Sequence, residues 1–198
     1  MVGIEIDRQR VLDAQPFADD RTRFVEGGFE VPLPSDVGSP RLIRAMNVLR
    51  QYPEEAVHSA WEQMGHRLIP GGLLVEGTSD PTGRLLAANL LRRHDHGLEH
   101  EGVLLSVRLN KPFQPTDLQP ILPKNLIHRL VDDHPAAEFF ASWTRAWRQS
   151  SSLRPFGPPQ VFVAAAQTMY RETGAIKRPD RWTHRGYILW RLAPGGSH

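Results

Sequence analysis

The chain has 198 residues, enough for one domain with a sizeable core, and its formal charge of only +2 gives no support to an obligate nucleic-acid partner. It has no cysteine, which excludes disulfides, thiolate metal sites and a cysteine nucleophile. No apolar run reaches the length of a membrane span, and the first residues lack a basic region followed by an apolar one. The sequence therefore predicts a cytoplasmic protein with no membrane partner.

The first fifty residues predict short, alternating strands and helices. Residues 2–7 alternate apolar and polar side chains, as a short strand does, and end in acidic residues. We expect a helix over 8–14, a strand over 23–25 and extended chain over 29–33. Residues 41–52 fit either an amphipathic helix or a short buried strand, so both alternatives stay open.

The middle of the chain predicts the units of an α/β protein. A helix over 53–67 is followed by the turn Pro70-Gly71-Gly72 and a strand over 73–75. Ser79 or Asp80 is positioned to cap a further helix from Pro81 to about Arg93. Later elements are a strand over 102–109, helical turns over 118–131, helices over 136–148 and 159–173, and a strand over 186–192.

This alternation predicts an α/β fold: a doubly wound, mostly parallel sheet with helices on both faces. We expect one domain over residues 1–198. Residues 1–110 would form the α/β core, and residues 111–198 a helical region with the final strand.

Four segments, in their order, resemble class I S-adenosylmethionine-dependent methyltransferases, which have a Rossmann-like fold. Residues 2–7 (VGIEID) resemble the second strand of that family, and 24–33 (FVEGGFEVPL) the third strand with the loop that touches adenine. Residues 42–52 (LIRAMNVLRQY) resemble the fourth strand and the loop facing the methyl group. Residues 68–77 (LIPGGLLVEG) resemble the common helix–turn–strand signature.

The resemblance implies S-adenosylmethionine as cofactor and three cofactor-binding residues. Glu5 would accept hydrogen bonds from the ribose, Phe29 would contact adenine, and Asn47 would lie near the reacting methyl group. Each also has an ordinary structural interpretation: Glu5 as a solvated strand end with Asp7 capping a helix, Phe29 as core, and Asn47 bound to a neighbouring turn. No catalytic residue, metal site, methyl acceptor or oligomeric state is indicated.

Two features depart from the family. The place of an acidic residue before the adenine contact is taken by Gly28, and no glycine-rich first strand precedes Val2. That first strand lies between the second and the fourth, so its absence would leave neighbours roughly 9–10 Å apart with unpaired backbone groups. We therefore expect the start at Met1 to be internal to a longer natural chain, which an in-frame stop codon directly upstream of Met1 would refute. The alternative is a degenerate homologue that binds no cofactor.

Three further groups of residues could carry function. The cluster His94 to Glu101 has metal-ligand chemistry but the composition of an exposed loop, and we expect no metal there. Glu76 and residues 77–81 would occupy a strand-to-helix junction on the cleft side. Aromatic residues after position 110 either line an acceptor pocket or pack in the core: Trp143, Trp147 and Phe156. Two rival functions stay open: a nucleotide-binding Rossmann domain and a non-enzymatic interaction module.

Overall fold

The first 26 residues of the computed structural model, which describes residues 1–131 and 133–191, form a strand–helix–strand segment. Strands β1 (Val2–Glu5) and β2 (Arg23–Glu26) pair in parallel, with Glu5 opposite Glu26. Helix α1 (Arg8–Ala14) connects them and is capped by Asp7, whose carboxylate accepts from the backbone N–H groups of Gln9 and Arg10. The predicted strands, helix and cap are confirmed here.

A second sheet has five strands and is mixed. Its strands, in spatial order, are β3 (Leu42–Met46), β4 (Leu73–Ser79), β5 (Leu85–His94), β6 (Gly97–Val107) and β7 (Tyr187–Trp190). Strands β6 and β7 are antiparallel, with Leu105 opposite Ile188. The α/β class is confirmed, whereas a mostly parallel, doubly wound sheet is not. Residues 2–7 and 42–52, which resemble the second and fourth strands of one sheet in the family, contribute β1 and β3 to separate sheets of the described chain.

The helices largely follow the sequence pattern. Two long ones, α4 (Pro135–Gln149) and α5 (Pro158–Thr173), each begin at a proline, which suits the first helical turn. The other helical elements are η1 (Gln15–Phe17), η2 (Leu49–Gln51), α2 (Ala56–Arg67), η3 (Pro115–Ile121), α3 (Lys124–Ile127), η4 (Ser150–Phe156) and η5 (Thr183–Arg185). Over residues 1–131 and 133–191, no helix is both long and apolar enough to cross a membrane.

The predicted helix from Pro81 to Arg93 is wrong, because a tight turn reverses the chain into strand β5. The Asp80 carboxylate accepts from the Thr82 hydroxyl at 2.7 Å and from the Leu85 backbone N–H at 2.9 Å. Gly83 completes the turn with φ of 62°, a left-handed conformation that glycine adopts without steric cost. The apolar run that follows was equally compatible with a buried strand, and the turn chemistry of residues 80–83 decides between the two.

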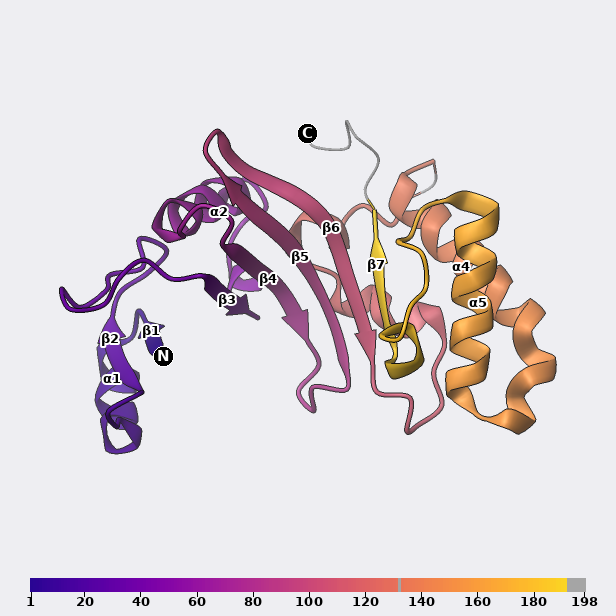
Figure 1. Cartoon of the computed structure of the whole chain (residues 1–198), viewed down its shortest axis with the longest axis horizontal. Helices are drawn as coiled ribbons and strands as arrows, with labels where there is room; N and C mark the ends of the chain where they lie inside the picture. Colours follow the sequence, from indigo (N-terminus) through magenta and orange to yellow (C-terminus); the bar gives the residue numbers. More distant parts are fainter. Residues whose placement is uncertain (132, 192–198) are drawn as a thin grey trace. The chain divides into compact units, whose positions relative to one another are not determined.

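The described residues form two compact units whose segments alternate along the chain. The first unit contains residues 1–43, 55–74 and 92–99, and therefore β1, α1, β2 and α2. The second unit contains residues 44–54, 75–91 and the chain from His100 onward. In the second unit, α4 and α5 lie side by side next to β7 (Figure 1).

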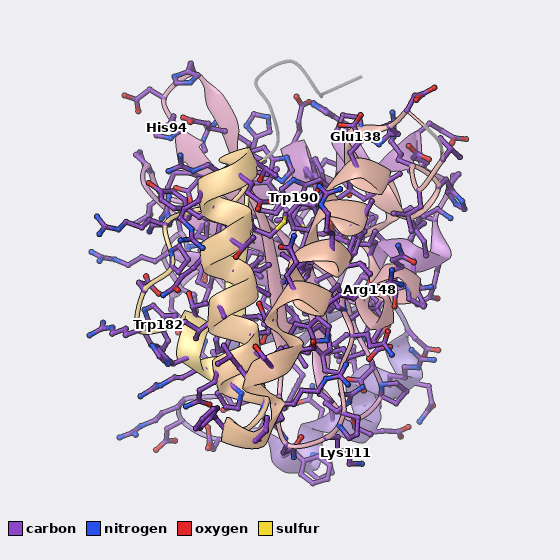
Figure 2. The ribbon with its side chains drawn as sticks, turned by 90° about the vertical axis from the view of Figure 1, so that its right-hand side faces the viewer. His94, Lys111, Glu138, Arg148, Trp182 and Trp190 are labelled. Atoms are coloured by element: carbon purple, nitrogen blue, oxygen red, sulfur yellow. The ribbon has the colours of Figure 1, made fainter. Side chains whose placement is uncertain are left out.

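The core of the second unit lies between these two helices and the β5–β7 strands. Trp143 of α4 is fully buried, and its ring centroid lies 5.8–6.3 Å from four other rings: Phe113, Phe139, Phe140 and Phe162. Trp190 of β7 stacks on Phe139 with centroids 4.3 Å apart, and Figure 2 shows it behind α4 and α5. Burial of large aromatic rings of this kind is a major source of folding free energy.

Candidate functional site

The parallel pairing of β1 and β2 brings Glu5 beside the start of the loop that carries Phe29. The Gly27 backbone N–H donates to the Glu5 carbonyl oxygen at 3.0 Å, directly after the last pair of the ladder. Phe29 follows two residues later and is half-buried. The structure thus places these two sequence-predicted residues on neighbouring strand ends of the first unit.

The Glu5 carboxylate is accessible and only lightly engaged. Its side chain is 39% exposed, its Oε2 lies 3.7 Å from Arg10 Nη1, and its Oε1 accepts from the Asp7 backbone N–H at 3.1 Å. An ionised carboxylate offers about four acceptor positions, so two hydroxyl donors could still be accommodated. The carboxylate therefore retains acceptor positions for further hydrogen-bond donors.

The loop after β2 is a strained turn, which differs from the extended chain predicted over 29–33. Val31 is buried and has φ of 48°, a conformation that is rare for a β-branched residue. Its backbone N–H donates to the Gly28 carbonyl at 3.1 Å, and its carbonyl accepts from Arg67 Nε of α2 at 3.1 Å. Such strained residues persist where the surrounding contacts fix them, and they concentrate at functional sites.

Glu30 supplies a carboxylate that sequence reasoning missed. Its Oε1 accepts from the Gly28 backbone N–H at 2.9 Å, and this bond together with its own N–H lowers the pKa of Glu30. The carboxylate therefore lies at the glycine where the sequence appeared to lack an acidic residue. A glutamate two positions after Gly27-Gly28 was the available signal, because such a side chain can fold back onto the turn.

Asn47 lies in the second unit and binds the end of the neighbouring strand β4. It has φ of 63°, its backbone N–H donates to the Gly77 carbonyl at 2.7 Å, and its amide oxygen accepts from the Ser79 N–H at 2.9 Å. Its amide nitrogen donates to the Ser79 hydroxyl at 3.2 Å. The structural interpretation of Asn47 is therefore the one realised here, although the residue is exposed.

Glu76 does not face an open cleft, which corrects its predicted place at a strand-to-helix junction. It is 2% exposed, and its Oε2 accepts from Asn89 Nδ2 at 2.9 Å. The same Asn89 nitrogen lies 3.0 Å from Asn125 Oδ1, so β4, β5 and α3 share one polar network in the second unit. A buried carboxylate of this kind depends on its hydrogen-bond partners for stability.

The histidine cluster contains a contact between His94 and Glu99, and two of the three aromatic candidates lie in the core. His94 Nε2 lies 3.1 Å from Glu99 Oε2, and the described residues contain no group of three potential metal ligands. Trp143 and Trp147 are buried in the core of the second unit, whereas Phe156 is 70% exposed.

Sequence reasoning also missed a basic and aromatic segment that includes β7 and the residues before it. Residues 177–191 contain five lysine or arginine residues and one acidic residue, interleaved with Trp182, Tyr187 and Trp190. A search along the sequence for local charge, rather than net charge, would have found it.

The comparisons with known proteins add no relationship: no protein-family model and no curated protein matches the chain. Function is therefore inferred from the residues at the two strand ends.

Proposed function

We propose that this chain carries the nucleoside-binding part of an S-adenosylmethionine-dependent methyltransferase with a Rossmann-like fold. One observation carries the proposal: Glu5 and the loop of Phe29 lie side by side at the carboxyl ends of two parallel strands. In open α/β sheets, ligands bind outside the carboxyl ends of the strands. An accessible carboxylate at one strand end and an aromatic residue in the loop after the other would suit the ribose and the adenine of an adenosine group.

The residues present fit the ribose and adenine parts of the cofactor. Glu5 would accept from the two ribose hydroxyls, Phe29 would contact one face of adenine, and Arg67 would hold the loop through the Val31 carbonyl. When bound, the cofactor supplies a sulfonium-activated methyl group. The protein's part is then alignment of the acceptor, which requires no general acid or base at this edge.

Asn47 ties the end of β3 to Ser79 at the end of β4, within the second unit. No contact of Asn47 with the cofactor is proposed, because β1 and β3 belong to separate sheets of the described chain.

Calorimetric titration with S-adenosylhomocysteine tests the proposal on this chain and on one extended upstream along the genomic reading frame. We expect the extended chain to bind and its Glu5→Gln variant to bind roughly tenfold more weakly, because a charged acceptor is lost. Glu55→Gln is the matched control: Glu55 is an exposed glutamate outside the two strand ends, so binding should change less than about twofold.

The other outcomes would support a rival function or contradict the proposed role of Glu5. Binding of NADH in place of S-adenosylhomocysteine would support a nucleotide-binding Rossmann domain. Absence of binding by both chains would favour the interaction module. Equal losses in Glu5→Gln and Glu55→Gln would contradict the ribose role of Glu5.

A further inference from the structure

The second unit contains a pocket of about 360 Å³ over strands β5, β6 and β7, remote in sequence from Glu5 and Phe29. Its floor is apolar and consists of Leu90, Leu104 and Leu189, one from each strand. These leucines are half-buried, unlike the neighbouring residues that point into the aromatic core. The volume lies within the range of small-molecule sites, about 300–1,000 Å³.

Two exposed aromatic residues form a wall of this pocket. Trp182 is 45% exposed and Tyr187 is 38% exposed, and their rings meet edge to face with centroids 6.2 Å apart. Trp182 is labelled in Figure 2 beside the helical layer. Exposed rings over an apolar floor leave a site that an apolar body can fill.

The wall is held in place by a hydrogen-bonded turn. The Asp180 carboxylate accepts from the Trp182 backbone N–H at 2.8 Å, and the Asp180 N–H donates to the buried Thr183 hydroxyl at 3.1 Å. The Tyr187 N–H donates to the Trp182 carbonyl at 3.2 Å. The pocket is therefore formed before any ligand arrives, which lowers the entropic cost of binding.

The side chains around this pocket carry a net positive charge. Lys177 and Arg178 line it, and Arg181 and Arg185 lie with their guanidinium carbons 5.1 and 5.2 Å from the centre of the Trp182 ring. Within residues 1–131 and 133–191, none of these four cations lies in an ion pair. Asp180, the acidic residue of the lining, is engaged by the Trp182 backbone.

We propose that this pocket binds a small amphipathic organic anion, with an aromatic or medium-chain aliphatic body on the leucine floor and an acidic head at Lys177 and Arg178. The apolar floor excludes a fully hydrated ion such as free phosphate as the preferred ligand, and the cations select against amines. An extended polyanion would not need the apolar recess. This proposal is independent of the methyltransferase proposal.

Fluorescence titration with 8-anilinonaphthalene-1-sulfonate tests the site directly. We expect the double variant Lys177→Gln/Arg178→Gln to weaken binding at least tenfold. The matched control Arg154→Gln/Arg171→Gln removes the same charge at exposed positions outside the pocket and should weaken binding less than twofold. Leu104→Phe, which fills the floor without changing charge, should also weaken binding at least fivefold. Unchanged circular-dichroism melting curves establish that each variant is folded.

Competition between the probe and other ligands identifies the head group that the pocket prefers, and it tests nucleic acid as the rival partner. Decanoate and decyl phosphate should displace the probe, their relative strengths distinguishing a carboxylate from a phosphate ligand, and decylamine should not. Equal effects of the two double variants, or displacement by decylamine, would overturn the proposal. It would also be overturned if a single-stranded oligonucleotide bound through Lys177 and Arg178 while decanoate and decyl phosphate failed to displace the probe.

Discussion

In β1 all four residues are half-buried, whereas in β6 the side chains of Val103, Leu105 and Val107 are completely buried. The first sheet has two strands. The seven-residue helix α1, which connects them, buries Val11. The second sheet is covered by two long helices with a dense aromatic core. A two-stranded sheet is at best marginally stable in water by itself. The candidate cofactor edge therefore lies in the part of the chain with the smaller core.

The largest effect is expected from removing a ring at the centre of the aromatic core. Trp143→Ala should lower the free energy of unfolding by about 3–5 kcal/mol, because it leaves a large cavity. Urea denaturation followed by circular dichroism measures this change. Trp143→Phe should cost less, because the Trp143 N–H has no hydrogen-bond partner among the described residues. Trp182→Ala, at an exposed position, is the control; a loss equal to that of Trp143→Ala would contradict the assignment of the core.

A somewhat smaller loss is expected at the turn into β7. Gly186 has φ of 86°, and a Cβ there would lie 2.0 Å from the Val107 carbonyl oxygen. Gly186→Ala should therefore cost about 2–3 kcal/mol through strain and steric overlap. Gly174 is a matched control with φ of 63° and open space around it, so Gly174→Ala should cost about 1 kcal/mol. Equal losses of stability in Gly186→Ala and Gly174→Ala, measured by thermal denaturation, would show that Gly186 does not approach the Val107 carbonyl of β6.

In the first sheet, the helix cap should have a local effect. Asp7→Ala removes the acceptor for two backbone N–H groups and should destabilise α1 by about 1 kcal/mol. Native-state hydrogen exchange should show faster exchange in residues 2–14 with little change in β6 and β7. Asp13→Ala removes only a side-chain hydrogen bond to Gln9 and serves as the control. A change spread over both sheets would contradict the difference between them.

The smallest effect is a pH dependence from His100. Burial lowers the pKa of this imidazole, while a bond to the Gly102 backbone acts in the opposite direction. The unfolded chain therefore binds a proton more readily, so this contribution to stability is present above the unfolded pKa of about 6.5 and is lost as the pH falls below it. His100→Gln should flatten the stability profile between pH 7 and 5. An unchanged slope in His100→Gln would refute this assignment.

Elements with clear local sequence signals could be predicted, whereas conformations that depend on contacts with distant residues could not. Helices α4 and α5 have clear starts and amphipathic periodicity, and β7 is an apolar strand after a glycine, so all three were predictable. Strand β5 was predicted as a helix because its apolar run is compatible with both structures, and only the Asp80 turn decides. The left-handed conformation of Val31 could not be predicted, since it depends on contacts such as that of Arg67 from another element.

The candidate site was predictable to a similar extent. Glu5 at a strand end and Phe29 in a following loop follow from local pattern. The pairing of Asn47 with Ser79 joins residues far apart in the chain, and no local rule specifies it. The basic pocket near Trp182 was missed because the overall charge of +2 conceals a local excess of cations.

Hydrogen exchange with and without S-adenosylhomocysteine, on the upstream-extended chain, tests the central claim most directly. The account predicts that the ligand slows exchange in residues 2–5 and 23–33, where the smaller core leaves the backbone most open. Unchanged exchange in those residues, or protection confined to residues 177–189, would contradict the assignment of Glu5 and Phe29 to a bound adenosine group.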